Sequence, residues 1–174
     1  MAMTPPTDEP NLLQTTAGPA VPRSRIPLLV ALPTILALAF WLQVYRLNDV
    51  SLRGDEAFSV TFARQDLGEM WRGLLLTEPH PPLYYTMLHY WMAAAGQSEL
   101  SVRFVSAFFG LLTVAFTYRL ARSLCAEERV AQVAALMVAL NPYLVWQSQD
   151  ARMYTLLTAT CAGSFLLASL VWRA

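Results

Sequence analysis

The chain has 174 residues, of which 56% are hydrophobic and 14% are charged, and its formal net charge is zero. Soluble domains carry about a quarter charged residues, so this composition excludes an ordinary soluble domain and indicates a membrane protein. Nothing in the charge suggests nucleic-acid binding. No GxGxxG or P-loop pattern occurs, and the two cysteines, Cys125 and Cys161, lack the spacing of a metal site or a disulfide framework.

Residues 1–25 are rich in Pro, Thr and Ala and show no periodicity, which predicts a disordered cytoplasmic tail. Four later stretches are apolar enough to cross a hydrocarbon core of about 30 Å as helices. The sequence therefore predicts an all-α polytopic membrane protein with about four transmembrane helices. The predicted spans are 26–45, 101–121, 130–149 and 153–172.

The segment 81–96 is apolar but short, and its Tyr, Trp and His residues are typical of the membrane–water interface. We expect an interfacial helix there, within a long outer loop, 46–100. With the tail inside, the inner segments carry net positive charge and the outer segments net negative charge, in agreement with the positive-inside tendency. Under this topology Asp55, Glu56 and Asp150 face the same outer compartment.

Asp55 and Glu56 lie in the stretch SLRGDEAFSVTFAR, just beyond the first predicted span. A helix is predicted to follow them, because Phe58 and Phe62 are four residues apart and would share a face. Acidic residues at such a position are suited to capping the helix. A rigidly held carboxylate near the membrane is equally suited to act as a general base for an acceptor hydroxyl. From the residues alone both interpretations stay open.

Two other stretches are polar where chemistry is plausible. In TEPHPPLYY, three prolines fix the backbone around His80, which is either a solvated loop residue or a donor at the height of lipid phosphates. In NPYLVWQSQDARMY, the pair Asn141–Pro142 predicts a kink, and a polar cluster follows it. Asp150 and Arg152 in that cluster form either a weak salt bridge or a site that positions a phosphate or a sugar.

The ordered motifs RGDE, EPHPPLYY, RF.SA.FGLLTV and NPYLVWQSQDARMY resemble the N-terminal part of glycosyltransferase family 39, from about residue 26 to 172. These are membrane enzymes of the GT-C superfamily, and they include protein mannosyltransferases and the lipid A aminoarabinose transferase. The resemblance implies that residues 26–174 form the N-terminal part of a GT-C-like transmembrane domain. It also implies transfer of a sugar from a polyprenyl-phosphate donor to a hydroxyl of a protein, lipid or glycan on the outer face.

The same resemblance assigns residues to roles. Asp55 would be the catalytic base, Glu56 would orient the acceptor or Asp55, and Asp150 would be a second catalytic acid near the centre. The side chains expected to bind the donor phosphate or its lipid are His80, Tyr84, Arg152 and Tyr154.

Some family members place a metal-binding carboxylate directly before the position of His80, where this chain has Pro79, with Glu78 one residue further back. The resemblance therefore implies no certain cofactor and leaves a divalent metal open. It implies contact with membrane lipids and no nucleic acid. The expected location is a bacterial inner (plasma) membrane, with the N-terminus cytoplasmic and the active face outside.

Family members have more spans and more outer loops, so we expect this chain to be a fragment, a truncated product or one part of a split enzyme. The alternative is a non-catalytic membrane subunit or truncated product derived from such an enzyme. A transporter is disfavoured, because that class places ionisable residues deep within its spans. Here the predicted spans carry charges only near their ends.

Overall fold

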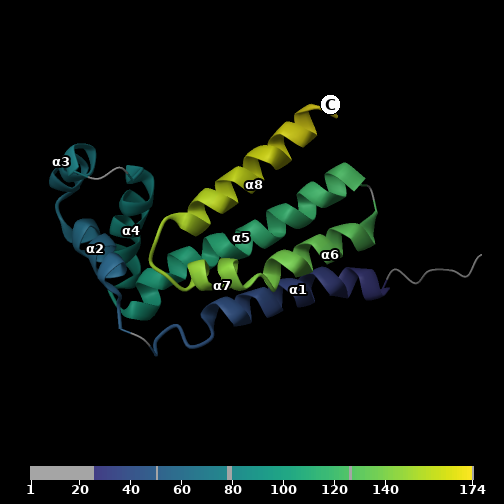
Figure 1. The fold of residues 1–174 in the computed structure, drawn as a ribbon, viewed down its shortest axis with the longest axis horizontal. Coiled ribbons are helices and arrows are strands. Elements are labelled where there is room, and N and C mark those ends of the chain that lie inside the picture. The colour runs from purple at the N-terminus through teal and green to yellow at the C-terminus, as the bar shows by residue number, and fades with distance from the viewer. Residues whose placement is uncertain (1–25, 50, 78–79, 126, 174) are drawn as a thin grey trace, which may run out of the picture.

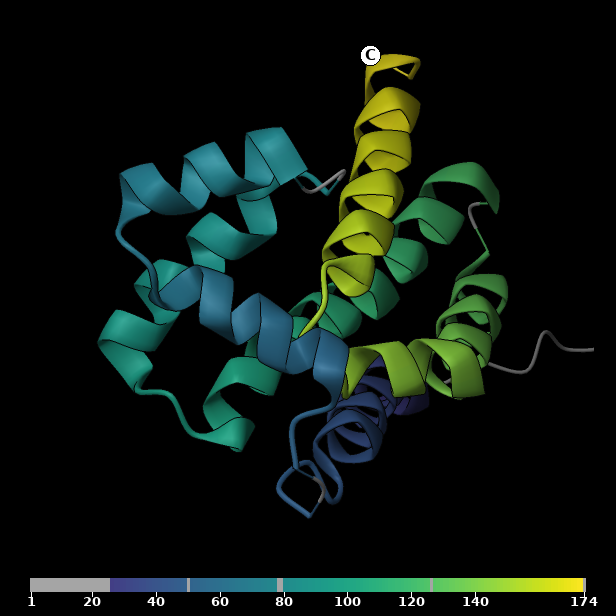
Figure 2. The ribbon, with the colours of Figure 1, turned by 60° about the vertical axis from the view of Figure 1, so that its left-hand side comes forward.

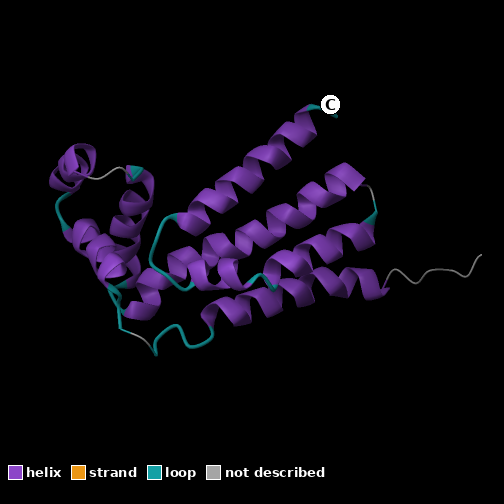
Figure 3. Cartoon of the chain, in the orientation of Figure 1, coloured by secondary structure: helices purple, strands orange, loops and turns teal. Residues whose placement is uncertain are grey.

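The computed structural model describes residues 26–49, 51–77, 80–125 and 127–173, so the predicted disordered tail lies outside the described residues. Over the described ranges all regular structure is helical, which confirms the all-α prediction (Figure 3). The helices are α1 (Ile26–Val44), α2 (Gly54–Arg64), α3 (Leu67–Thr77), α4 (Pro82–Ala95), α5 (Glu99–Cys125), α6 (Glu128–Ala139), α7 (Pro142–Ser148) and α8 (Tyr154–Val171).

The helix α5 is the centre of the fold and contacts α1, α4, α6, α7 and α8 (Figure 1). On one side, α1, α5 and α6 share an apolar core around Ile35, Val114 and Ala135. On the other side, α8 packs along α5, and the first turns of both helices meet α2 and α4 in a second core. Small residues such as Ala135 and Ala139 are fully buried where α6 meets its neighbours, which lets the helix axes approach closely.

The helices α2, α3 and α4 form a separate layer at one end of the long helices (Figures 1 and 2). A small core of Met70, Leu74 and Tyr85 holds this layer together. His89 Nδ1 lies 2.8 Å from the Ala63 carbonyl oxygen, and because a carbonyl can only accept, the ring nitrogen donates and ties α4 to the end of α2. The helix expected at 81–96 is thus present as α4, and its placement at a membrane interface stays a prediction.

Two helices, α5 and α8, are long and apolar enough to cross a membrane. The consecutive helices α6 and α7 together satisfy the same test but are bent by 59° at the break between them, so they form either a broken span or a re-entrant loop. The helix α1 adds a shorter apolar stretch, Val30–Val44. Two to three spans therefore rest on helix length and composition, and the count of four stays a prediction.

The break between α6 and α7 falls at Asn141–Pro142, as the sequence predicted. Pro142 has no N–H to continue the helix. The Asn141 side chain caps the new helix instead, because its Oδ1 accepts hydrogen bonds from the backbone N–H groups of Tyr143 and Leu144. The bend directs the end of α7 toward the start of α2, and polar residues of both segments line the same pocket.

Candidate functional site

A buried ion pair joins the start of α2 to the start of α5. Arg103 donates from Nε to Glu56 Oε1 at 2.8 Å and from Nη2 to Glu56 Oε2 at 2.7 Å, and both side chains are almost inaccessible to solvent. The same guanidinium also donates to the carbonyl oxygens of Leu47 and Ser51. A bidentate pair with its remaining donors satisfied is the arrangement that compensates for burying two charges.

The Glu56 carboxylate receives backbone donors as well. The Arg53 N–H bonds to Oε2 at 2.9 Å, which is the return bond of a capping box, and the Ala151 N–H bonds to Oε1 at 2.9 Å. Burial by itself raises the pKa of Glu56, but the donors from Arg103 and the two N–H groups outweigh it, so the pKa lies below its ordinary value. Glu56 therefore holds the loop after α7 against the start of α2.

Above this ion pair lies a polar pocket of ≈ 440 Å³. The start of α2 forms one wall, α7 another, and the loop between α7 and α8 closes the base. The residues that line it are Arg53, Gly54, Asp55, Glu56, Tyr143, Trp146, Gln147, Asp150, Arg152 and Tyr154. Five of the predicted site residues, from two segments nearly a hundred positions apart, therefore meet in one pocket.

Two ion pairs cross the pocket between these segments. Arg152 Nη1 lies 3.8 Å from Asp55 Oδ2, and Arg53 Nη1 lies 3.6 Å from Asp150 Oδ1. Both distances exceed that of a hydrogen bond, so each carboxylate keeps capacity for a ligand. The Arg152 guanidinium also stands over the ring of Tyr154, 5.6 Å from its centroid.

The carboxylates of Asp55 and Asp150 have different surroundings. The Asp55 side chain is 83% exposed, whereas that of Asp150 is 17% exposed. Burial, and after it the neighbouring Glu56 charge, raises the pKa of Asp150 above its ordinary value, against the lowering effect of Arg53. Asp55 is thus open to solvent, and Asp150 is the more buried of the two.

Hydrogen bonds hold the loop that carries Asp150 and Arg152. Ser106 on α5 donates to the Arg152 carbonyl oxygen at 3.0 Å, so the Tyr84 hydroxyl, 3.1 Å away, donates to Ser106 in turn. The Gln149 side chain donates to the carbonyl oxygens of Leu42 and Tyr45 at the end of α1. These contacts fix the pocket to three separate helices.

Three predicted site residues take positions that differ from the expectation. Tyr84 is 1% exposed, and its buried hydroxyl, whose pKa burial raises, contacts Ser106 instead of a lipid or phosphate. Glu56 is 1% exposed and bonded to protein groups on both oxygens, and its expected role of orienting the acceptor or Asp55 stays a prediction. His80 is half-buried before α4 and is not part of the lining of this pocket.

The positions compared above with a metal-binding carboxylate of some family members, Glu78 and Pro79, lie outside the described residues. Within the part of the chain that the structure describes, no group of three or more His, Cys, Asp or Glu side chains could hold a metal ion.

Several important residues were missed by the sequence analysis. Arg53, Tyr143 and Trp146 line the pocket, and the Arg53 guanidinium stands 6.0 Å from the centroid of the Trp146 ring. Arg103 was counted only as a charge near the end of a span. An arginine in the apolar part of a helix needs a buried partner, and that signal would have pointed to an acidic residue elsewhere.

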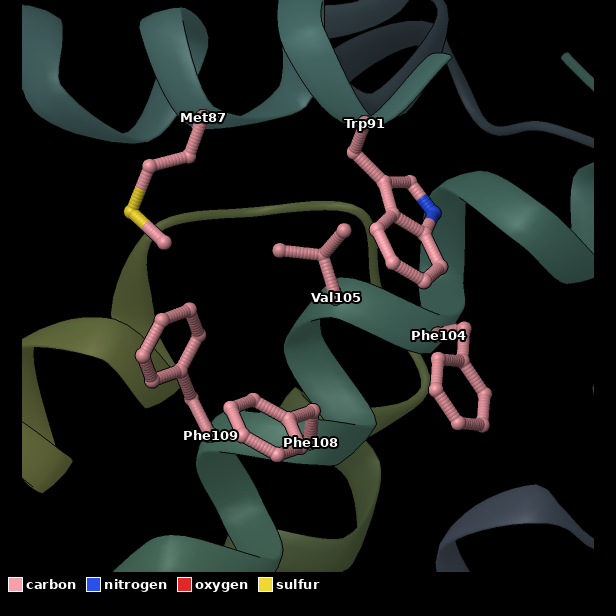
Figure 4. Close-up of a pocket in the computed structure, with 6 residues that line it drawn as sticks. All are labelled: Met87, Trp91, Phe104, Val105, Phe108 and Phe109. Carbon is pink, nitrogen blue, oxygen red and sulfur yellow. The ribbon is translucent and has the colours of Figure 1, made fainter. Parts of the chain in front are cut away.

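A second pocket, of ≈ 320 Å³, lies between α4 and α5 and is apolar (Figure 4). Met87 and Trp91 reach down from α4 toward the phenylalanines of α5. The Trp91 N–H, the polar group of this wall, is used by the Ser101 carbonyl oxygen at 2.9 Å. The lining consists of Met87, Trp91, Phe104, Val105, Phe108 and Phe109. It suits a hydrocarbon chain, not a charged ligand.

Comparison with known proteins gives one match. The model of the family described as dolichyl-phosphate-mannose-protein mannosyltransferase matches residues 79–174, more than half of the chain. No curated protein and no solved structure matches. The matched segment includes Asp150, Arg152 and the aromatic wall of the polar pocket, formed by Tyr143 and Trp146, but it begins after Asp55. The family match and the apolar helices show that the chain is an integral membrane protein. The chain belongs to the dolichyl-phosphate-mannose-protein mannosyltransferase family of membrane glycosyltransferases.

Proposed function

We propose that the polar pocket binds the phosphate and sugar of a polyprenyl-phosphate-linked donor, and that the sugar passes to an acceptor hydroxyl on the outer face of the membrane. The observation that carries this proposal is the meeting of Asp55, Asp150, Arg152 and Tyr154 in one pocket. The family match supports the reaction class. A bacterial inner membrane and a cytoplasmic N-terminus belong to the same proposal.

In the proposed reaction Asp55 acts as the base. Its exposed carboxylate accepts the proton of the acceptor hydroxyl while the acceptor oxygen forms a bond to the anomeric carbon of the sugar. The bond from that carbon to the phosphate oxygen breaks, and the polyprenyl phosphate leaves with the bonding electrons. Attack from the opposite face inverts the anomeric centre.

Arg152 binds the donor phosphate. Its side chain is 12% exposed, and its contacts with Asp55 and the Tyr154 hydroxyl are at 3.4 Å or longer, so its guanidinium keeps donors for an anion. Positive charge at this point stabilises the leaving phosphate as its negative charge develops. Tyr154 supports Arg152, and His80 is a further phosphate contact expected from the resemblance.

The sugar is placed against the aromatic wall. Tyr143 and Trp146 offer apolar ring surfaces, and Gln147 and Asp150 offer polar groups that suit sugar hydroxyls. A mixture of aromatic and polar groups is what a ligand with apolar ring faces and hydroxyl edges requires.

The test is a transfer assay with the full chain in lipid nanodiscs and a mannosyl polyprenyl phosphate labelled in the sugar. We expect Asp55→Asn to lower transfer by about 100-fold or more, because the base is removed. The matched control is Asp49→Asn, which removes a nearby exposed carboxylate that pairs with Arg46 outside the pocket. Absence of transfer by the wild-type chain, or equal rates for both variants, would contradict the proposal.

A further inference from the structure

Arg53 stands at a boundary between two cavities. Beside the polar pocket lies a smaller one of ≈ 50 Å³, lined by Arg46, Leu47, Arg53, Arg103, Trp146, Gln149 and Asp150. The residues common to both linings are Arg53, Trp146 and Asp150. The guanidinium of Arg53 lies beside Trp146 and Asp150 at this boundary.

The backbone of Arg53 is held by hydrogen bonds, and its side chain contacts Asp150 and Trp146. Arg53 is the N-cap of α2, where its N–H bonds to Glu56 and its carbonyl oxygen accepts from the Ala57 N–H at 2.8 Å. The side chain is 54% exposed and reaches across to Asp150 at 3.6 Å. The ring of Trp146 supports the guanidinium from one side at 6.0 Å. An anchored base with an extended, half-exposed arm is suited to orienting a neighbour across a pocket.

The other charged groups around Asp150 are engaged elsewhere. Glu56 repels the Asp150 charge, and Arg103, which attracts it, already makes its short hydrogen bonds to Glu56. Arg152 stands beside Asp55 and Tyr154.

At the edge of the smaller cavity, Arg46 pairs with Asp49 at 2.6 Å. Arg53, by contrast, forms an ion pair with Asp150.

We propose that Arg53 is a positioning residue of the site, which pairs with Asp150 from its place beside Trp146 and orients the Asp150 carboxylate for the bound donor. This role rests on the proposed function of the pocket. The physical reason is that a cation within about 4–6 Å favours the charged form of a carboxylate, which burial and Glu56 otherwise disfavour. Without Arg53 the carboxylate would take up a proton at a higher pH.

The direct test is a carboxyl ¹³C NMR titration of the full chain in detergent micelles, with labelled aspartate and the Asp150 signal assigned by its loss in Asp150→Asn. In Arg53→Gln we expect the Asp150 midpoint to move to higher pH by about one pH unit. Arg53→Lys keeps the charge and should hold the midpoint near that of the wild type. The matched control, Arg46→Gln, removes a neighbouring exposed guanidinium and should leave the midpoint unchanged.

An unchanged Asp150 midpoint in Arg53→Gln would overturn the inference, as would an equal movement in Arg46→Gln or in Arg53→Lys. In Arg53→Gln the signals of Asp49 and Asp66 should stay in place, since a general loss of structure would move them too. This readout needs no donor. If the Asp150 midpoint rises in Arg53→Gln but the wild-type chain transfers no sugar, the pairing stands and the proposed function fails.

Discussion

The polar pocket is lined by the start of α2, by α7 and by the residues after α7, and the start of α5 supports it, whereas the apolar pocket is lined by α4 and α5 and has the opposite chemistry. Arg103, Ser106 and Gly110 follow a spacing of three and four residues and face the side that supports the polar pocket. Phe104, Val105, Phe108 and Phe109 face α4 and line the apolar pocket. Neighbouring residues of α5 thus support a polar pocket on one face of the helix and line an apolar pocket on another.

The two pockets also differ in the interactions that hold their lining residues in place. The apolar pocket depends on ring packing, such as the stacking of Trp91 on Phe104 at 5.9 Å, which has no strict partner requirement. The polar pocket depends on buried groups that each need a specific partner, above all Arg103 and Glu56. We therefore expect substitutions under the polar pocket to have much larger effects than those around the apolar pocket.

The largest effect is expected from Glu56→Gln, which leaves the buried Arg103 charge without its counter-charge. Breaking a buried pair by removing one partner costs roughly 3–5 kcal/mol. The free energy of unfolding, measured by denaturant titration in mixed micelles, should fall by that amount. The matched control is Glu69→Gln, which removes an exposed carboxylate in the first turn of α3. Equal stabilities of the two variants would show that the ion pair does not hold the pocket.

The next effect is expected from Gly110→Ala. A Cβ at this position would lie 2.2 Å from Ser148 Oγ and 3.0 Å from Gln43 Oε1, so α5, α7 and α1 would have to move apart. Overpacking of this kind costs about 1–3 kcal/mol, which the same unfolding titration measures. Gly54→Ala is the control, since a Cβ there meets nothing within 4 Å. A neutral Gly110→Ala would show that the crossing of α5 and α7 is looser than the structure indicates.

A smaller effect is expected in the pH dependence of stability, where Glu56 and Asp150 act in opposite directions. The pKa of Glu56 is lowered by folding, so its contribution is present above the ordinary glutamate pKa and is lost as the pH falls through the folded value. The pKa of Asp150 is raised, so ionising it costs stability as the pH rises from the ordinary aspartate pKa to the folded value.

Thermal unfolding of the wild type, Glu56→Gln and Asp150→Asn across this acidic range checks both signs. Relative to the wild type, Asp150→Asn should be more stable at neutral pH than at acidic pH. Glu56→Gln should lack the stabilisation that the wild type gains as the pH rises. Opposite slopes would contradict the assigned pKa directions.

The smallest effect compares two tryptophans, Trp91 in the apolar pocket and Trp146 in the polar one. In variants that keep either Trp91 or Trp146 as the only tryptophan of the five in the chain, brominated acyl chains should quench Trp91 more strongly, and aqueous acrylamide should quench Trp146 more strongly. The reason is that acyl chains are expected to reach the ring-lined apolar pocket, which borders the candidate span α5. Water is expected to reach the polar pocket, where Trp146 lies beside Arg53 and Asp150. Equal quenching of both by lipid would remove the distinction between the pockets.

Much of the fold follows from local patterns. The apolar runs predicted α5 and α8, the Phe58–Phe62 spacing predicted α2, and the two rings indeed lie 4.5 Å apart. The Asn141–Pro142 pair predicted the break before α7. The charge pattern placed Asp55 with Asp150 on one side, and the structure brings both to one pocket.

The remainder could not be predicted, because it depends on partners far apart in the chain. Nothing local indicates that Glu56 bonds to Arg103 and Ala151, which lie 47 and 95 positions later. The interfacial position of α4 stays a prediction, but its sequence did not show that Tyr84 and Tyr85 are buried in protein contacts. A Tyr is amphipathic, and only the packing of α4 on α5 decides which role it takes.

The most direct test of the central claim is the affinity of the full chain in nanodiscs for a polyprenyl-phosphate sugar, measured by the binding of a fluorescent donor. Arg152→Gln should weaken binding by about 10-fold to 100-fold, the loss expected for hydrogen bonds to a charged group. Arg119→Gln, at an exposed position of α5 far along the helix, should bind like the wild type. Unlabelled polyprenyl phosphate should compete and neutral polyprenol should not. Equal affinity of Arg152→Gln and wild type, or equal competition by polyprenol, would show that the polar pocket is not where the donor phosphate binds.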